Sequence, residues 1–374
     1  MRIGIDARLI HETGVGRYIR NLIAELGAID EKNTYIIFLR NDAYEAFTPP
    51  SPRFYARRAD VRWHTFREQI YLPFLFLQAR LDILHVPYFN VPVFYPGRMV
   101  VTIHDLTILQ RDTGKASTLP LPLYKLKRLG YRFVLESGMR RARKIIAVSE
   151  ATKREIMHEF GIESEKIEVT HEGVDEKLRT QDLRRKTQGR FIQSPYFLYV
   201  GNAYPHKNLE MLMKAFAVYV SRFTVKTRLV LVGKEDYFYR RLQHLVATMN
   251  LGDVVVFWGE ANDTELASLY AHAASLVFPS LSEGFGLPAL EAISFGCPVI
   301  CSDIPVFHEI VGDKGIYVDP NDPSAWAAVM KNMIEAPHQR KNRPVSKNDE
   351  LFRKYNWKTM AEKTLRVWSD IASR

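Results

Sequence analysis

The stretch from residue 274 to residue 300 constrains the fold of this chain more than any other. It opens with the apolar run Ala274–Phe278, which has the length and composition of a buried strand and breaks at Pro279 into a polar turn with glycines. Leu287–Phe295 is predicted to be a helix that ends at Gly296, and a second apolar run follows it. A buried strand, a loop and a helix that returns to another buried strand indicate an α/β protein with a parallel sheet.

Glu283 and Glu291 are the candidate ligand-binding residues of this stretch. In parallel sheets, ligands bind at the carboxyl ends of the strands, where a helix N-terminus attracts anions. Gly284 and Gly286 would let the backbone approach a phosphate. Glu283, in the loop, would accept hydrogen bonds from sugar hydroxyls, and Glu291, about two helical turns on, would reach a ribose. The alternative is a buried strand and helix whose glutamates bind nothing.

The residues around these two glutamates carry a resemblance to a known family. Ser-Glu-Gly-Phe-Gly-Leu-Pro, then Glu-Ala, then Gly-Cys-Pro-Val-Ile, resembles the signature of glycosyltransferase family 4, in which seven residues separate two glutamates. Members of that family are retaining enzymes of the GT-B fold. The resemblance extends over nearly the whole chain. It therefore implies an α/β protein with two Rossmann-like, doubly wound domains that face each other across a cleft.

The length of 374 residues also predicts two domains, because single cores rarely grow beyond about 300 residues. We expect an N-terminal, acceptor-side domain over residues 1–175 and a C-terminal, nucleotide-sugar-binding domain over residues 196–356. Between them, residues 176–195 carry six Lys or Arg and no long apolar run, which is typical of a linker. The resemblance implies that a last helix, residues 357–374, crosses back to the N-terminal domain.

The sequence carries no recognisable signal for export or membrane insertion. No run approaches the roughly 18 uninterrupted apolar residues of a membrane-spanning helix, and the stretch from Met1 to Asp6 is too short and acidic for a signal peptide. We therefore expect a cytoplasmic protein. Its two cysteines, Cys297 and Cys301, are expected to be buried thiols in a reducing compartment.

The formal charge of +10 favours an anionic partner. Between Arg111 and Lys144 there are ten Lys or Arg against two acidic residues, interleaved with aliphatic and aromatic side chains. Three interpretations of the helix predicted over Pro120–Arg143 stay open: a core helix with a solvated basic face, a helix that docks peripherally on an anionic membrane at its inner face, or a nucleic-acid-binding helix. Because we find no nucleic-acid-binding motif, we expect no nucleic acid partner.

The first domain shows the alternation of strands and helices that is typical of α/β proteins. The first strand is predicted at residues 2–6, and further strands are predicted at Tyr35–Leu39, Val61–His64, Ile83–Val86 and Met99–Ile103. A short apolar helix is predicted at Gln69–Leu81.

Two candidate sites follow strands of this domain. Between the strand predicted at residues 2–6 and the next helix lies a loop that would either cradle a phosphate or form a simple tight turn: Gly14, Val15, Gly16 and Arg17. His104 follows a later apolar run, where it is either a loop residue or a functional one. The resemblance implies that the glycine loop faces the donor diphosphate and that His104 lies beside the anomeric carbon of the donor sugar.

The second domain begins with a strand and a loop that resembles the family's diphosphate-binding loop. Lys207 lies just before a predicted helix, where it would meet a phosphate; the alternative is an exposed lysine in a capping loop. In the resembled family an arginine follows the first glycine of this loop and a lysine comes five residues later. Lys207 matches the lysine, whereas Asn202 replaces the arginine. Arg17 or His206 are the candidates to supply the missing cation.

The expected reaction develops negative charge on a leaving diphosphate, and stabilising that charge is the main task of the site. The resemblance implies a retaining reaction, and we expect no metal cofactor because we find no Asp-x-Asp motif. We assign catalytic roles to His104, Glu283 and Lys207. Gly259 is expected to border the nucleotide base. The candidate donor-binding residues are Gly14, Val15, Gly16, Arg17, Asn202, Lys207, Gly259, Glu283, Gly284, Phe285, Gly286, Leu287 and Glu291.

The donor is predicted from four further stretches, Gly-Ile-Asp-Ala-Arg, Thr-Gly-Val-Gly-Arg-Tyr, His-Asp-Leu-Thr and Gly-Asn-Ala-Tyr-Pro-His-Lys-Asn. They resemble bacterial mannosyltransferases of surface polysaccharide assembly, which implies GDP-mannose as the donor and a glycan or lipid-linked acceptor. Two other functions stay open. A nucleotide-sugar epimerase would consume the donor without an acceptor, and a non-enzymatic basic protein would bind nucleic acid or membrane regardless of Glu283 and Glu291.

Overall fold

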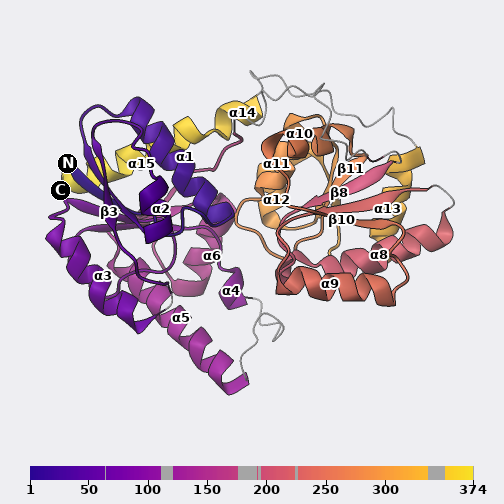
Figure 1. Ribbon diagram of the computed structural model, residues 1–374, viewed down its shortest axis with the longest axis horizontal. Helices are drawn as coiled ribbons and strands as arrows, with labels where there is room; N and C mark the ends of the chain where they lie inside the picture. Colours follow the sequence, from indigo (N-terminus) through magenta and orange to yellow (C-terminus); the bar gives the residue numbers. More distant parts are fainter. Residues whose placement is uncertain are drawn as a thin grey trace. The chain divides into compact units, whose positions relative to one another are not determined.

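The computed structural model describes residues 1–63, 65–110, 121–175, 192, 195–223, 226–335 and 350–373. These residues form two compact units, each built on a parallel sheet (Figure 1). The first unit contains the described residues up to Gly173 and those from Lys354 onward, and the second extends from Val174 to Arg353. The expected linker at residues 176–195 falls almost entirely outside the described residues.

The sheet of the first unit has seven parallel strands in the order β3-β2-β1-β4-β5-β6-β7. Their bounds are β1 Arg2–Asp6, β2 Thr34–Leu39, β3 Phe54–Arg58, β4 Ile83–Val86, β5 Met99–Ile103, β6 Lys144–Ala147 and β7 Ile167–Val169. The central strands β4 and β5 are buried along their whole length, as expected for a parallel sheet covered by helices on both faces.

The prediction of a strand at Val61–His64 is wrong, because the third strand is β3 at Phe54–Arg58. Arg57 and Arg58 give β3 a polar composition, which a strand at the edge of a sheet tolerates because a smaller part of it is buried. Val61 is buried beyond the end of that strand, in a segment without regular structure.

The helices of the first unit pack on both faces of its sheet (Figure 1). They are α1 Gly14–Ile29, α2 Asn41–Ala46, α3 Phe66–Gln78, α4 Thr107–Gln110, α5 Leu121–Arg141, α6 Glu150–Phe160, the short η1 Ser164–Lys166 and α15 Trp357–Ala372. Ser149 caps α6 by accepting a hydrogen bond from the Thr152 backbone N–H at 3.0 Å. The C-terminal helix α15 packs against α1 (Figure 1).

The sheet of the second unit has six parallel strands in the order β10-β9-β8-β11-β12-β13. Their bounds are β8 Tyr196–Val200, β9 Arg228–Val232, β10 Val255–Gly259, β11 Ser275–Phe278, β12 Val299–Ser302 and β13 Gly315–Val318. Its helices are η2 Pro205–Lys207, α8 Leu209–Arg222, α9 Tyr237–Thr248, α10 Asp263–His272, α11 Leu287–Ser294, α12 Pro305–Ile310, η3 Gly312–Lys314 and α13 Pro323–Glu335, and α14 Glu350–Lys354 follows. Cys297 and Cys301 are both buried, as predicted.

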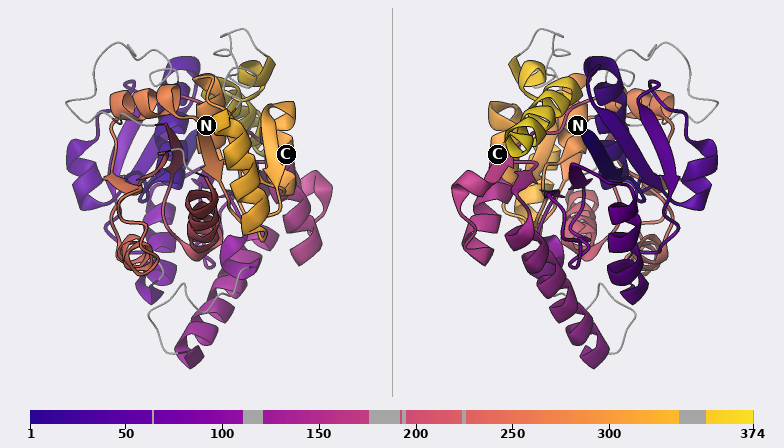
Figure 2. Two further views of the ribbon diagram at one scale, coloured as in Figure 1. Left: turned by 90° about the vertical axis from the view of Figure 1, so that its right-hand side faces the viewer. Right: turned by 90° about the vertical axis from the view of Figure 1, so that its left-hand side faces the viewer.

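Helix α5 is the longest of the described helices, and its N-terminal part extends beyond the rest of the first unit (Figure 2). Among the described residues, no helix combines the length and the apolar composition that crossing a bilayer requires.

Candidate active site

The strand order of the second unit reverses between β8 and β11. From β8 the chain moves outward through β9 to β10, then returns to the other side of β8 to form β11. In parallel sheets, ligands bind where the strand order reverses in this way, outside the carboxyl ends of the strands. The loops after β8 and β11 meet there, because the Leu281 N–H donates to His206 O at 2.8 Å and Asn208 Nδ2 donates to Pro279 O at 3.2 Å.

Lys207 and Glu283 form an ion pair where these two loops meet. Lys207 Nζ lies 2.6 Å from Glu283 Oε1, and the side chains are 14% and 9% exposed. Ser280 Oγ donates to the same carboxylate oxygen at 2.7 Å, and the ammonium lies 5.9 Å from the centroid of the Phe278 ring. The structure thus brings together two of the predicted site residues. An ammonium has three N–H donors, so Lys207 can hold Glu283 and a phosphate oxygen at once.

Gly286 shapes the start of helix α11, three residues after Glu283. Gly286 has a φ of 93° and caps the helix, a left-handed conformation that favours glycine. A Cβ at this position would also lie 2.9 Å from Phe307 Cε1. Gly284, Phe285 and Leu287 complete the turn that directs the N-terminal end of the α11 dipole toward the carboxyl edge of the sheet.

Glu291 lies in the second turn of α11, and its side chain is buried. The Tyr270 hydroxyl donates to Glu291 Oε2 at 2.8 Å, and the Tyr270 ring stacks on Phe295. Tyr270 therefore positions Glu291, the residue predicted to bind the ribose. The sequence analysis did not identify Tyr270. In the sequence, Tyr270 is marked only by its position late in the helix that precedes β11.

Asn202 lies in the loop after β8, and Gly259 ends β10 of the same sheet. The Tyr199 hydroxyl donates to Asn202 O at 2.6 Å, and Asn202 Oδ1 accepts from the Tyr204 N–H at 3.3 Å, so the side chain of Asn202 is bonded within its own loop. Gly259 ends β10 with a φ of 85°, and a Cβ added there would meet nothing within 4 Å. It lies two strands away from β8, and its carbonyl accepts from the Gly233 N–H at 2.9 Å.

The predicted glycine loop, Gly14–Arg17, is the first turn of helix α1, and its two glycines have different surroundings in the first unit. A Cβ at Gly16 would lie 2.6 Å from Ile10 O, so this glycine is required for packing. A Cβ at Gly14 would meet no atom within 4 Å, so packing does not require that glycine. Val15 and Arg17 are half-buried in the first turn of α1. This turn begins the helix that follows β1, where the strand order of this sheet reverses between β1 and β4.

His104 is held by hydrogen bonds at both ring nitrogens. Nδ1 lies 3.0 Å from Glu172 Oε1, and Nε2 lies 3.1 Å from Pro87 O. Tyr18 of α1 packs its ring edge-to-face on His104, with centroids 5.0 Å apart. A neutral imidazole has one N–H and an imidazolium has two, so only the protonated ring donates to both acceptors. A general-base role for His104 would require one of these bonds to break.

Glu172 was missed by the sequence analysis, although it follows β7 and therefore lies at the same carboxyl edge of the sheet as His104. Its carboxylate is buried. Within the described ranges, no three His, Cys, Asp or Glu side chains gather in a way that would hold a metal ion.

Two family matches together span most of the chain. Residues 13–178 match the family described as Glycosyltransferase Family 4, and residues 180–350 match Glycosyl transferases group 1. The chain belongs to glycosyltransferase family 4.

Relatives of this family 4 chain include two O-antigen chain mannosyltransferases. The chain is 29% identical to RfbU of Salmonella typhimurium over 286 residues, which cover 75% of this chain and 73% of that protein. It is 28% identical to O-antigen chain mannosyltransferase B of Escherichia coli over 292 residues, or 76% of this chain and 74% of that protein.

Solved structures share the fold of this family 4 chain. Sucrose-phosphate synthase from Thermosynechococcus elongatus aligns with a TM-score of 0.79 at 21% identity, covering 100% of this chain and 99% of that one. WaaG, a glycosyltransferase involved in lipopolysaccharide biosynthesis, aligns with a TM-score of 0.74 at 17% identity, covering 99% and 100%. The predicted GT-B fold class is thereby confirmed.

Proposed function

We propose that this glycosyltransferase moves mannose from GDP-mannose to a glycan or lipid-linked acceptor, with retention at the anomeric carbon. The observation that carries the proposal is the pairing of Lys207 with Glu283 across the loops that follow β8 and β11. The mannosyltransferase names of two relatives at 29% and 28% identity support the choice of sugar.

The second unit would bind the donor. Lys207 and the N-terminal end of α11 would stabilise the charge that grows on the leaving diphosphate. Glu283 would bind hydroxyls of the donor sugar, and Glu291, oriented by Tyr270, would bind the ribose. Gly259 would lie beside the base. Lys207 supplies a positive charge for the diphosphate, which supports a reaction that needs no metal cofactor.

The first unit would contribute the glycine loop and His104. In the proposed reaction the bond from the anomeric carbon to the phosphate oxygen breaks, and the acceptor oxygen bonds to the same face of that carbon. Because both nitrogens of His104 already face acceptors, the acceptor proton would pass to the leaving phosphate rather than to the ring. Asn202 can donate a hydrogen bond but supplies no charge, so Arg17 or His206 would provide the further cation.

We also propose that the protein works at the inner face of an anionic membrane, where a lipid-linked acceptor would be found. The basic stretch from Arg111 to Lys144 supports this partner; residues 111–120 of that stretch lie outside the described residues. No nucleic acid is proposed as a partner.

Product analysis tests the proposed function. The protein is incubated with radiolabelled GDP-mannose, with UDP-glucose and UDP-galactose as alternative donors, with and without a lipid-linked glycan acceptor, and with EDTA in a parallel set. Release of GDP that depends on acceptor, with label in the glycan, is the expected result in both sets. Conversion of the donor without acceptor would instead identify an epimerase. Transfer from a UDP-sugar but not from GDP-mannose would contradict the choice of mannose. Loss of activity in the EDTA set would contradict metal independence.

A further inference from the structure

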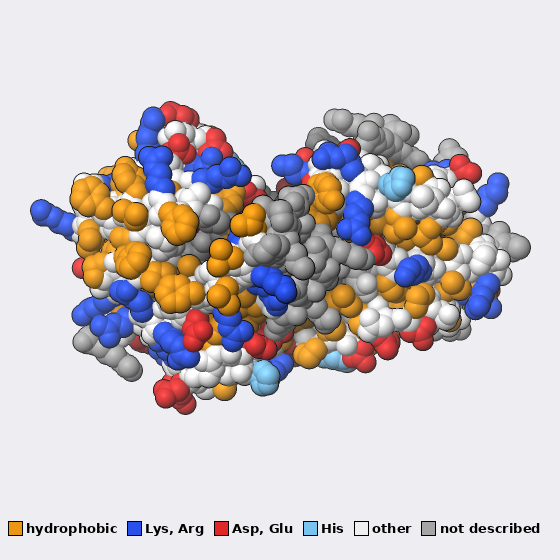
Figure 3. Space-filling view, turned by 90° about the horizontal axis from the view of Figure 1, so that it is seen from below, with side chains coloured by type: hydrophobic (Ala, Val, Ile, Leu, Met, Phe, Trp, Pro, Cys, Tyr) orange, Lys and Arg blue, Asp and Glu red, His pale blue; other side chains and the backbone are white. Residues whose placement is uncertain are grey.

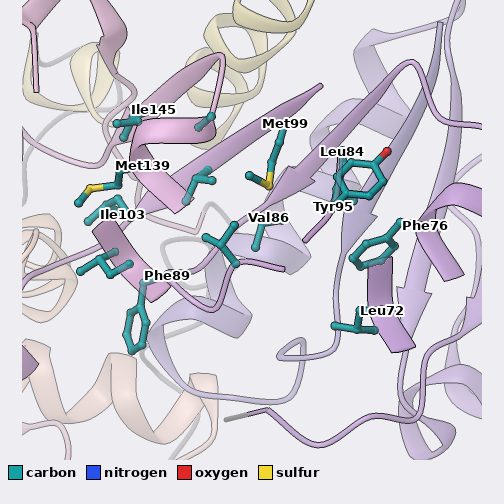
Figure 4. Close-up of a cluster of buried hydrophobic side chains, with 14 of the residues drawn as sticks. Leu72, Phe76, Leu84, Val86, Phe89, Tyr95, Met99, Ile103, Met139 and Ile145 are labelled. Carbon is teal, nitrogen blue, oxygen red and sulfur yellow. The ribbon is translucent and has the colours of Figure 1, made fainter. Parts of the chain in front are cut away.

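Helix α3 exposes a row of large apolar side chains in the first unit. Phe66 is 91% exposed, Ile70 74% and Phe74 57%, and their spacing of four residues places them on one face of the helix. Hydrophobic side chains gather on this side of the first unit (Figure 3). The other face of α3 carries Leu72 and Phe76, which are buried in the core of the unit (Figure 4). The helix is therefore anchored on one side and leaves its opposite apolar face exposed.

Helix α5 has a second apolar face of the same kind. Leu126, Leu129 and Phe133 are exposed at intervals of three and four residues, so they lie on one side of the helix. Leu135 and Met139, in its C-terminal half, are buried in the core that also holds α3. The part of α5 that carries the exposed residues extends away from the sheet (Figure 2).

The segment between β4 and β5 joins the two helices. From α3, Gln69 donates through Nε2 to Val91 O at 3.1 Å and accepts through Oε1 from the Val93 N–H at 2.8 Å. From α5, Arg141 donates to Val93 O. Phe94, the next residue, is exposed. Both helices therefore contact one segment, α5 through its C-terminal end, and this segment adds an exposed aromatic side chain of its own.

Basic side chains accompany the exposed apolar ones on both helices. On α3, the Arg67 guanidinium lies 5.6 Å from the centroid of the Tyr71 ring. Helix α5 contains one acidic residue, Glu136, against six basic ones: Lys125, Lys127, Arg128, Arg132, Arg140 and Arg141. Long basic side chains beside exposed aromatic and aliphatic ones are typical of surfaces that lie in the interface of a bilayer.

We propose that this face, formed by α3, Phe94 and α5, docks on an anionic lipid surface. Its apolar side chains would enter the boundary between headgroups and acyl chains, and its cations would bind lipid phosphates, each contributing roughly fivefold to binding. A second copy of the chain fits this face less well, because pairing would bring two cationic α5 helices together. The proposal deepens the proposed function by naming the surface that meets the membrane, and it adds an apolar contribution from α3 to the basic stretch.

Cosedimentation with vesicles tests this proposal independently of catalysis. Binding of the wild type is compared between phosphatidylcholine vesicles and vesicles with about 30 mol% phosphatidylglycerol, which have a strongly anionic surface. Each comparison is made at low and at high salt. Two variants separate the contributions: Phe66→Ser/Ile70→Ser/Phe74→Ser on α3, and Lys125→Gln/Lys127→Gln/Arg132→Gln on α5. Tyr237→Ser, which removes an exposed aromatic side chain from the second unit, is the matched control.

We expect the wild type and the Tyr237 variant to bind anionic vesicles preferentially. The α3 variant should lose about tenfold or more at both salt concentrations, and the α5 variant about tenfold or more at low salt alone. Absence of binding, equal binding to both vesicle types, or an unchanged α3 variant would overturn the proposal. So would a wild-type dimer in solution that the α3 substitutions dissociate.

Stabilisation of the α3 variant by GDP-mannose, equal to that of wild type, would show that its donor site is intact, so a failure of docking is distinguishable from a failure of the proposed function.

Discussion

Lys207 Nζ lies 2.6 Å from Glu283 Oε1, so the cation proposed for the donor diphosphate and the carboxylate proposed for the donor sugar form one ion pair. The two residues come from the loops after β8 and β11, adjacent strands that are separated in the chain by β9 and β10. Each residue therefore orders the other before the donor binds, which lowers the entropic cost of binding.

The first prediction concerns the stability of this pair. Lys207→Ala and Glu283→Ala should each lower the free energy of unfolding by about 2 kcal/mol, because each leaves a mostly buried charge without its counterion. The double variant should lose less than the sum by about 1 kcal/mol or more. Urea unfolding of the four proteins measures the cycle. Additive losses would mean that the two charges do not interact in solution.

A second prediction separates the two glycines in the first turn of α1. Gly16→Ala should destabilise the protein by about 1–3 kcal/mol, because the new Cβ would lie 2.6 Å from Ile10 O. Gly14→Ala has open space and should fold normally, yet weaken donor binding by about threefold or more if this backbone contacts the diphosphate. Thermal unfolding and donor titration of both variants decide the matter. Wild-type donor affinity in the Gly14 variant would remove the loop from the donor site.

The local sequence pattern predicted both members of the ion pair but not their contact. Lys207 and Glu283 were each placed after a strand by composition, whereas their pairing depends on β8 and β11 being neighbours, which no local pattern specifies. Glu172 and Tyr270 escaped notice for the same reason, because each is recognisable only through a partner far along the chain. The exposed face of α3 was also missed. A helix with apolar residues on most of its surface has no periodicity that tells which side is buried.

A third prediction concerns Glu172 as the residue that positions His104. Glu172→Ala should lower kcat by about 10- to 100-fold, because the ring loses one of its two anchors, while KM for the donor changes little. Glu172→Gln should retain most of the activity, because its amide oxygen still accepts from Nδ1–H. Steady-state kinetics of the two variants test this. Equal loss in both, or a change confined to KM, would contradict a positioning role.

A fourth prediction is that buried His85 makes the stability of the protein depend on pH. Burial, and then the nearby His104, lower the pKa of His85 from 6.5 to about 3. Nε2 lies 2.8 Å from Thr102 Oγ1, and Nδ1 has no hydrogen-bond partner among the described residues. At a pH between these two pKa values, His85 binds a proton in the unfolded chain but not in the folded one. The free energy of unfolding therefore falls as the pH falls.

This fourth prediction has a measurable size. His85 should account for a loss of about 2 kcal/mol between pH 8 and pH 5, and the neutral variant His85→Gln should lack that part of the dependence. Urea unfolding at the two pH values, with wild type and variant side by side, gives the difference. Parallel losses in the two proteins would show that His85 titrates normally in the folded state.

The most direct test of the account is the affinity for GDP-mannose of wild type, Lys207→Ala and Glu291→Ala, measured by calorimetric titration, with wild type also examined against UDP-glucose and ADP-glucose. We predict that wild type binds GDP-mannose in preference to the other two donors. Each substitution should weaken that binding by about 10- to 100-fold, the range expected for a lost hydrogen bond to a charged group. Unchanged affinity in both variants would contradict the site between β8 and β11.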